Sequence, residues 1–433
     1  MNRNTVIFKN VSLGILYKIL NMSLVYITLP VLLQYLEVEE YGVWVTIFSI
    51  ISIVFFVDGG IGNGLKTKLT EALSSNNVVL ARKYISTAYI FIFIISLILL
   101  IIGVFAINFI DLKKLLSANL NEYELKKVFL ATLLMIIISF ILSLYKSLYY
   151  AIQQTAKVEL SLLIYQAIIL FCVFLALHYS QRSLLLVALI YGGSNIIVGI
   201  IFTVLFFNNR QNIIPSFKFY SRKKANDLMS LSIGFFFIQL CMIVIFTTDN
   251  VIISKLLGPS EVTKYDIVYK LFQVIVILSV IVQNPFWPLY TEAFKNKDFN
   301  WIRKTLLKLN KLFIPFVLLV MLFVFISKPL IKIWIGKELD IPKNLILFMG
   351  VFVIIRVYGI IYMNFLNGIG KIKLQLGLYI IGAVINIPLS VFFVKYMNLG
   401  SPGVILATII SIISMTIILP IQSFKILKKS EYS

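Results

Sequence analysis

The chain has 433 residues, of which 60% are hydrophobic and 13% are charged, and its formal net charge is +21. A water-soluble domain of this length would alternate apolar stripes with charged surfaces, so this composition excludes an ordinary soluble fold and predicts that lipid surrounds most of the chain. The positive charge does not indicate a nucleic-acid binder, because Lys and Arg lie in short connections between apolar runs rather than in one solvent-facing patch.

Apolar runs of roughly 20 residues recur along the whole chain, and this is the length at which an α-helix crosses a bilayer. The first run follows Lys9 and has no small-residue cleavage site at its end, so we expect a retained span rather than a signal peptide. The predicted spans of the first half are 11–36, 41–61, 84–110, 128–150, 158–178 and 184–207. After a basic segment at 208–226, the second half continues with 228–257, 265–289, 309–326, 345–366, 374–394 and 404–424. The sequence therefore predicts an all-α polytopic membrane protein of about twelve transmembrane helices.

The two halves resemble each other in the order of short motifs. In the first half, Ser12-Leu13-Gly14 opens a span and Leu69-Thr70-Glu71-Ala72 follows the next span. In the second half, Ser232-Ile233-Gly234 and Tyr290-Thr291-Glu292-Ala293 come in the same order. Internal repeats of this kind are typical of transporters. We expect two six-helix lobes, at 1–215 and 216–433, related by an axis along the membrane normal and enclosing a central cavity.

Several motifs carry a resemblance to a known family. They are the stretch from Thr248-Asp249-Asn250 to Gly258-Pro259, the Asp58-Gly59-Gly60-Ile61-Gly62 end of the second span, and Asn284-Pro285. Together they resemble the Wzx-type flippases of O-antigen or capsule repeat units, in the MOP (multidrug, oligosaccharidyl-lipid, polysaccharide) exporter superfamily. The resemblance covers the whole chain. It implies two lobes that open alternately to each side of the bacterial inner membrane and carry an oligosaccharide outward on undecaprenyl pyrophosphate.

The same resemblance implies the partners of the protein. They are the lipid-linked oligosaccharide, a coupling cation that is either a proton or sodium, membrane lipids and other polysaccharide assembly proteins, with no nucleic acid. We expect no cofactor and no resident metal. The cysteines, Cys172 and Cys241, lie inside apolar runs and suggest neither a disulfide nor a metal site.

Basic residues within the spans are candidates for binding the substrate, because a cation at the centre of a membrane helix costs about 2.5 to 3.5 kcal/mol. Each is expected to face the cavity, together with polar neighbours at helical spacing. The candidate set is Lys18 with Asn21, Lys146, Lys270 with Gln273, and Arg356 with Asn364. The alternatives are that the lysines extend to the lipid headgroups and that Arg356 bonds to a carbonyl between helices.

Acidic residues within or at the end of spans are candidates for coupling transport to an ion gradient. Asp249 lies deep in the seventh span, where a lone carboxylate must protonate or meet a cation. The alternative for Asp249 is an ion pair with Lys270. Asp58 is the second candidate, although it could equally end its helix before Gly59 and Gly60.

Two other functions of membrane proteins would predict different residue patterns in the sequence. A MATE-type antiporter of cationic drugs or metabolites would favour an acidic cavity, whereas basic residues outnumber acidic ones within these spans. A membrane polymerase or ligase of lipid-linked repeats carries a large outer loop with catalytic Arg and His, and the longest predicted outer loop here is 111–127. We therefore expect a transporter rather than an enzyme.

The distribution of positive charge predicts the topology. If the amino terminus is inside, most Lys and Arg residues fall in inside segments, as the positive-inside rule requires. Both termini and the 208–226 segment are then cytoplasmic. Single cysteines placed in each of these regions should stay unmodified by an impermeant thiol reagent in intact cells and react after permeabilisation. Labelling of the 208–226 segment from outside would overturn this topology.

Overall fold

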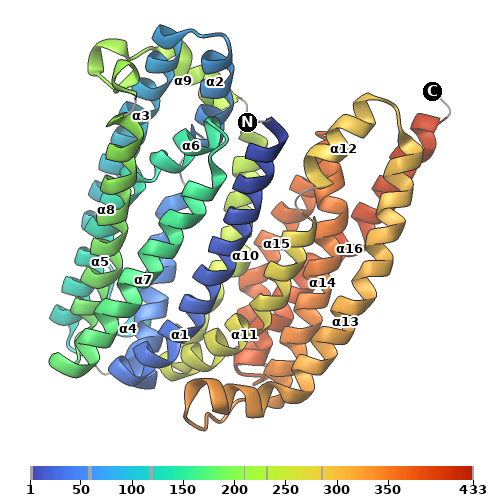
Figure 1. Ribbon diagram of the computed structural model, residues 1–433. Coiled ribbons are helices and arrows are strands. Elements are labelled where there is room, and N and C mark those ends of the chain that lie inside the picture. The colour runs from blue at the N-terminus through green and yellow to red at the C-terminus, as the bar shows by residue number, and fades with distance from the viewer. Residues whose placement is uncertain are drawn as a thin grey trace. The chain divides into compact units, whose positions relative to one another are not determined.

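A computed structural model of the protein describes residues 3–56, 61–116, 120–208, 210–230, 233–283 and 286–431. Almost all of these residues are helical, and the chain divides into two compact units, Met1–Phe236 and Phe237–Ser433. Figure 1 shows that long helices run side by side within each unit.

The first unit contains a bundle of long helices and several short ones. Its elements are α1 (Arg3–Ser52), η1 (Ile53–Phe56), α2 (Ile61–Ser74), α3 (Val78–Ala106), α4 (Leu112–Leu116), α5 (Glu122–Leu142), α6 (Leu144–Ala151), α7 (Thr155–Tyr179), α8 (Leu184–Asn208), η2 (Gln211–Ile213), η3 (Phe217–Phe219) and α9 (Arg222–Ser230). The short α2, α6 and α9 pack around the end of the bundle at which α3 and α7 begin (Figure 1).

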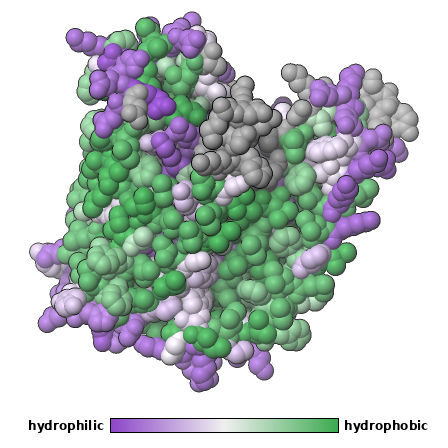
Figure 2. Space-filling view, in the orientation of Figure 1, coloured by the Kyte–Doolittle hydropathy of each residue, from purple (hydrophilic) through white to green (hydrophobic). Residues whose placement is uncertain are grey.

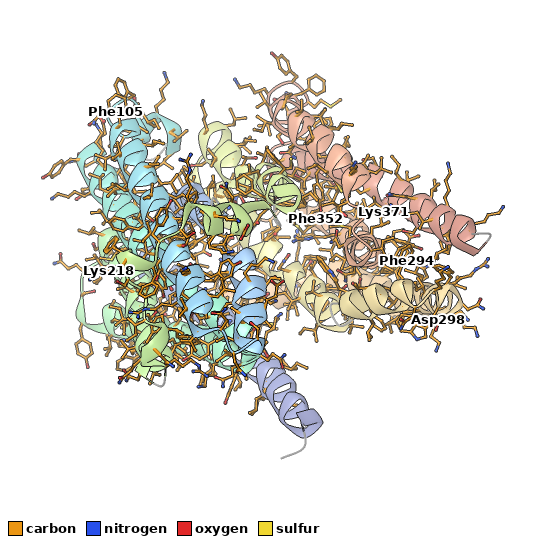
Figure 3. All side chains as sticks on the ribbon, turned by 90° about the horizontal axis from the view of Figure 1, so that it is seen from above. Phe105, Lys218, Phe294, Asp298, Phe352 and Lys371 are labelled. Carbon is orange, nitrogen blue, oxygen red and sulfur yellow. The ribbon has the colours of Figure 1, made fainter. Side chains whose placement is uncertain are left out.

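The second unit repeats this architecture. Its elements are α10 (Ile233–Leu257), which begins at the end of the first unit, α11 (Pro259–Gln283), α12 (Phe286–Lys295), α13 (Phe299–Ile335), α14 (Lys343–Gly368), α15 (Lys373–Lys395) and α16 (Ser401–Glu431). The turn from α12 to α13, which carries Phe294 and Asp298, lies beside the turn after α14, near Lys371 (Figure 3). The Thr291 hydroxyl joins the two turns by donating to the Gly368 carbonyl at 2.7 Å.

The predicted spans are confirmed as helices, with one difference in how they are divided. Within the described residues, 11 helices are long and apolar enough to cross a membrane, and one of them, Ser12–Phe55, contains most of the first and of the second predicted span. The two spans are separated at Glu37, where the backbone turns to φ 62° and ψ −179°. Arg182 holds the Glu37 carboxylate at 2.6 Å. The fold is thus the predicted all-α polytopic membrane protein.

The outer surfaces of the helices are apolar, as a lipid solvent requires. Along α3, Phe93, Ile98 and Ile101 are exposed, and along α13 so are Leu318 and Phe325. Figure 2 shows apolar residues over the middle of the helices and hydrophilic residues at their ends. This distribution fits a multi-pass protein whose helix ends meet water.

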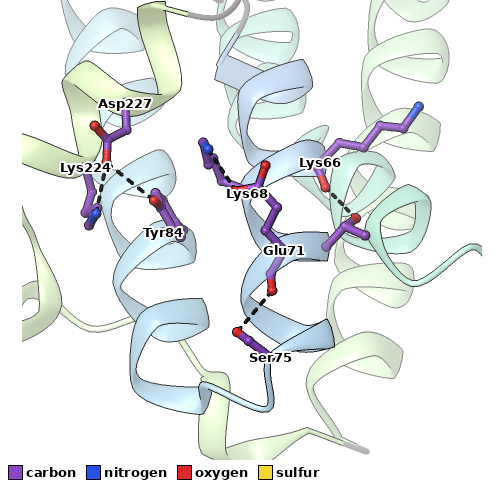
Figure 4. A network of polar contacts seen from close by, with 8 residues as sticks. Lys66, Lys68, Glu71, Ser75, Tyr84, Lys224 and Asp227 are labelled. Atoms are coloured by element: carbon purple, nitrogen blue, oxygen red, sulfur yellow. Dashed lines mark hydrogen bonds and ion pairs between the residues drawn. The ribbon is translucent and has the colours of Figure 1, made fainter. Parts of the chain in front are cut away.

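The segment that follows α8 packs on the first unit. The Ser216 amide donates to the Ser86 hydroxyl at 3.0 Å and the Ser221 amide to the Thr87 hydroxyl at 3.1 Å, both on α3. On α9, Lys224 donates to Asp227 at 2.9 Å, and this hydrogen bond holds the pKa of Asp227 below its usual range (Figure 4). These contacts join the segment after α8 to the first unit, which ends at Phe236, whereas the sequence predicts a second lobe that starts at residue 216.

Close helix packing in the second unit depends on a glycine of α15. A Cβ atom at Gly382 would lie 2.5 Å from the Ser411 carbonyl oxygen of α16, whereas a Cβ at Gly377, on the same helix, would have no atom within 4 Å. The first distance is too short for any real contact, so α15 and α16 would have to move apart.

Gly382→Ala should therefore lower the thermal unfolding midpoint of the purified protein in detergent. Gly377→Ala makes the same chemical change on the same helix and should leave the midpoint unchanged or raise it, since Ala favours a helix by about 1 kcal/mol over Gly. Equal midpoints for the two variants would show that the α15–α16 contact does not limit stability.

Candidate functional site

A polar cavity of about 470 Å³ lies in the first unit, between α2, α6, α7 and α8. Its polar lining includes Lys66, Lys146, Tyr150, Tyr165 and Asn195. The rest of the lining includes aromatic rings and small side chains, namely Phe48, Phe55, Phe140, Gly62, Ser143 and Ser147. The lysines of this lining could bind an anion, and its aromatic rings and polar atoms could contact a ring-shaped polar group beside that anion.

The short helix α6 places one face of side chains in this cavity. Ser143, Lys146, Ser147 and Tyr150 recur at helical spacing and line the cavity. Tyr145, Leu148 and Tyr149, which alternate with them, are buried outside the cavity lining, and the two tyrosines tie α6 to its neighbours. Tyr145 shares a hydrogen bond of 2.7 Å with Ser161 of α7, and Tyr149 donates to the Phe202 carbonyl of α8 at 3.3 Å. The position of Lys146 therefore follows from the packing of α6.

The two cavity lysines meet aromatic rings rather than carboxylates. The Lys66 ammonium lies 5.2 Å from the centroid of the Tyr150 ring, and the Lys146 ammonium lies 5.9 Å from that of Tyr145. Neither forms an ion pair with any residue that the structure describes. Glu159 of α7 interacts with Lys146 and Lys18 only through longer-range electrostatics. The cavity thus keeps a positive charge that an anionic ligand could neutralise.

Arg356 lines a second cavity, of about 250 Å³, within the second unit. One of its terminal nitrogens donates to the Tyr269 hydroxyl at 3.2 Å, and its guanidinium lies 4.8 Å from the Phe246 ring and 5.7 Å from the Phe352 ring. Among the described residues no carboxylate pairs with it. Because a guanidinium carries five donors, most of its hydrogen-bonding capacity is available to an anion.

The remaining predicted substrate residues have other surroundings. Lys18 and Asn21 are half-buried on α1 and are absent from the lining of the first cavity, as judged from the described residues. Lys270 pairs with Asp266 one turn earlier on α11, at 2.6 Å, while Gln273 is half-buried on the same helix. Asn364 lines the second cavity but donates to the Gln283 carbonyl at 3.2 Å, which joins α14 to α11.

Asp249 is buried in a cluster of oxygen atoms from four helices. Its carboxylate accepts a hydrogen bond from Tyr265 at 2.6 Å and from Thr408 at 3.3 Å. The Asn386 side chain donates to the Thr408 hydroxyl at 3.2 Å. The alternative for Asp249 was an ion pair with Lys270, but the carboxylate that Lys270 contacts at 2.6 Å is that of Asp266, on its own helix, and the Asp249 carboxylate accepts from Tyr265 and Thr408.

Two further oxygens near this cluster lack hydrogen-bond partners. The Asn386 amide oxygen and the Ser390 hydroxyl, one turn apart on α15, are buried and accept or donate no hydrogen bond within the described part of the chain. A carboxylate with neutral amide, hydroxyl and carbonyl oxygens is the donor set that hard cations prefer. These residues could therefore hold a cation. Asp58, the other acidic candidate for ion coupling, lies outside the described residues, and so do Asn284 and Pro285.

Sequence reasoning missed several of these residues. Lys66 falls in the connection between the predicted spans 41–61 and 84–110, although Gly62 and Lys66 recur at the spacing of one helical turn. Asp266 stands four residues before Lys270, a spacing that predicts an ion pair on one helix. No sequence signal pointed to Asn386 or Thr408, because polar residues of this size are common in membrane helices and only the packing brings them to Asp249.

Comparison with known proteins agrees with the fold. The family model "Polysaccharide biosynthesis protein" matches residues 7–294, and the model "MatE" matches residues 235–392. A Yersinia pseudotuberculosis protein named "Putative O-antigen export protein" is 23% identical over 382 residues, which are 82% of each chain. A Salmonella typhimurium protein named "Putative O-antigen transporter" is 26% identical over 186 residues, which cover 42% of this chain and only 43% of that relative.

Solved structures share the fold at low sequence identity. A multidrug resistance MATE family transporter of the MOP superfamily, in its inward-facing conformation, has a TM-score of 0.80 at 14% identity, with 95% of this chain and 96% of that chain covered. A MOP superfamily transporter from Pyrococcus furiosus has a TM-score of 0.70 at 15% identity, covering 98% and 96%. Since the first family model matches more than half of the sequence, the chain belongs to the polysaccharide biosynthesis protein family, with the fold of the MOP transporters.

Proposed function

We propose that the protein is a flippase that moves an oligosaccharide repeat unit, linked to undecaprenyl pyrophosphate, from the cytoplasmic to the outer leaflet of a bacterial inner membrane. The observation that carries this proposal is the set of cavity-lining cations, Lys66, Lys146 and Arg356, that form no ion pair within the described residues. The names of the Yersinia and Salmonella relatives, which refer to O-antigen export and transport, support the class of substrate.

The chemistry of the cavities suits this substrate. A pyrophosphate that leaves water for a low-dielectric site needs cations at short range, because an isolated ion would lose many kcal/mol of solvation. Lys66 and Lys146 supply point charges, and Arg356 supplies a planar fork that can donate two parallel hydrogen bonds to phosphate. Tyr150, Tyr165 and Asn195 offer ring faces and polar atoms to a sugar.

The same charges argue against the main alternative. A MATE-type antiporter would have to hold a cationic drug or metabolite beside Lys66 and Lys146, which would repel it. An anionic head group with a prenyl tail in lipid meets no such penalty.

We propose further that a sodium ion drives transport by binding at Asp249. Support comes from the number of oxygens around that carboxylate, including the Thr408 hydroxyl and the unpartnered amide oxygen of Asn386. A proton needs only one basic atom, whereas a sodium ion uses several neutral oxygens, so this donor set favours sodium. Sodium that moves inward down its gradient would drive the lipid head outward, so the proposed coupling is an antiport.

Removing the cavity cations should abolish export. Lys66→Ala, Lys146→Ala and Arg356→Ala should each strongly reduce surface polysaccharide in a strain that lacks its own flippase, at unchanged membrane levels on immunoblots. Lys146→Arg should keep most of the activity, while Arg356→Lys should keep only part because it loses the planar fork. The half-buried Lys18 and the paired Lys270 are expected to contribute through charge as well, and their Ala variants belong in the same series.

The matched control is Lys308→Ala, which removes an exposed cation from α13 outside both cavities. It should export normally. Wild-type export by all three cavity variants would contradict the proposed role of these cations.

The sodium proposal predicts a specific stabilisation. Sodium at about 100 times its dissociation constant should stabilise the purified protein by about 2.7 kcal/mol relative to potassium at equal ionic strength. Asp249→Asn and Thr408→Val should lose this difference in unfolding midpoint. Thr416→Val on the same helix should keep it, because the Thr416 hydroxyl donates within α16 to the Ile413 carbonyl and has no bond to the Asp249 cluster among the described residues. Identical midpoints in sodium and potassium for the wild type would rule out sodium binding.

A further inference from the structure

A groove of about 260 Å³ runs along the side of the first unit, away from the polar cavity. It is lined by Tyr89, Ile90 and Phe93 of α3, Ile141 of α5, and Pro215 and Phe217 of the segment before α9. This lining is almost entirely apolar and shares no residue with that of the cavity around Lys66 and Lys146. The groove is therefore a separate feature that the proposed transport path does not use.

The groove opens toward the surface that faces lipid. Phe93 is 52% exposed and begins a line of exposed apolar residues along α3 that continues through Leu97 and Ile101. On the other side of the groove, Phe217 is 82% exposed, beside exposed Ile214. An acyl chain lying along α3 could thus enter the groove without crossing polar surface.

The segment that forms one wall is fixed to α3. The Arg82 guanidinium donates to the Ile214 carbonyl at 2.8 Å and lies 4.3 Å from the Phe219 ring. The Ser216 amide donates to the Ser86 hydroxyl, which also lines the groove. The wall is therefore part of the folded unit, and Arg82 stands directly at its edge.

Positive charge gathers at this edge without acidic partners. Arg82 is half-buried, Lys218 is exposed, and neither forms an ion pair within the residues described. Arg222 and Lys223 are also exposed and unpaired among those residues, while Lys224 is neutralised by Asp227. Figure 3 shows Lys218 at the rim of the first unit.

We propose that this groove binds an anionic phospholipid of the surrounding leaflet, with an acyl chain between Phe93 and Phe217 and the phosphate at Arg82 and Lys218. An apolar groove gives affinity for any chain, and unpaired cations at the interface select an anionic head group. Each basic residue near the membrane surface contributes a preference on the order of fivefold.

The test uses fluorescence quenching by brominated lipids. Phe217→Trp places an indole in the groove wall, and the signal of the unmodified protein, which has four tryptophans, is subtracted. In nanodiscs, brominated phosphatidylglycerol should quench the new tryptophan at a mole fraction at least fivefold lower than brominated phosphatidylcholine. Equal quenching by the two lipids would overturn the proposal.

Charge variants in the same background identify the head-group contacts. Arg82→Gln combined with Lys218→Gln should remove the preference for phosphatidylglycerol. Arg82→Lys keeps the charge and should retain most of the preference, which would show that the fold tolerates a change at this position. Lys304→Gln with Lys308→Gln, which removes two exposed cations from α13, should have no effect. Persistence of the preference in the Arg82 and Lys218 double variant would refute the assignment. So would displacement of phosphatidylglycerol by trace undecaprenyl phosphate, because the groove would then hold the prenyl chain of the substrate.

Discussion

Hydrocarbon does not solvate charge, and this constraint explains most of the structure. Backbone groups in lipid must find partners within their own segment, so the chain forms long helices with apolar outer faces. The polar connections and the short helices α2, α9 and α12 lie at the ends of the bundles. Any ion within the spans must then be paired, enclosed by hydrogen bonds or placed in a cavity.

The protein uses each of these solutions at a different place. Lys270 has a carboxylate one turn away, at Asp266, which offsets the cost of its charge within the span. Asp249 is surrounded by hydroxyl and amide groups that can exchange a hydrogen bond for a cation. Lys66, Lys146 and Arg356 line cavities beside aromatic rings and pair with no carboxylate among the described residues, which is costly unless a ligand of opposite charge binds. The distinction separates residues that stabilise the fold from those suited to transport.

The sequence predicted the helices well, because length and hydropathy alone determine which segments enter lipid. Even the break at Glu37 lies between the first two predicted spans, although one continuous element, α1, carries both. The surroundings of single residues were harder to predict. The partner of Lys270 was visible in the spacing of α11, but the oxygens around Asp249 come from α11, α15 and α16, and the role of Lys66 depends on how α2 folds back beside α6. These contacts depend on packing between segments that are far apart in the sequence, and hydrophobic periodicity does not predict that packing.

In the proposed function, unpaired cations in the cavities carry an anionic lipid head across the membrane. The most direct measurement is translocation in proteoliposomes that contain the purified protein and an undecaprenyl-pyrophosphate-linked oligosaccharide with an oxidisable sugar. Loss of protection from external periodate reports each head group that crosses the bilayer. We expect rapid loss of protection with the wild type. With Lys146→Ala combined with Arg356→Ala, the rate of loss should be little above that of protein-free vesicles. Equal rates for the wild type and this double variant would contradict it.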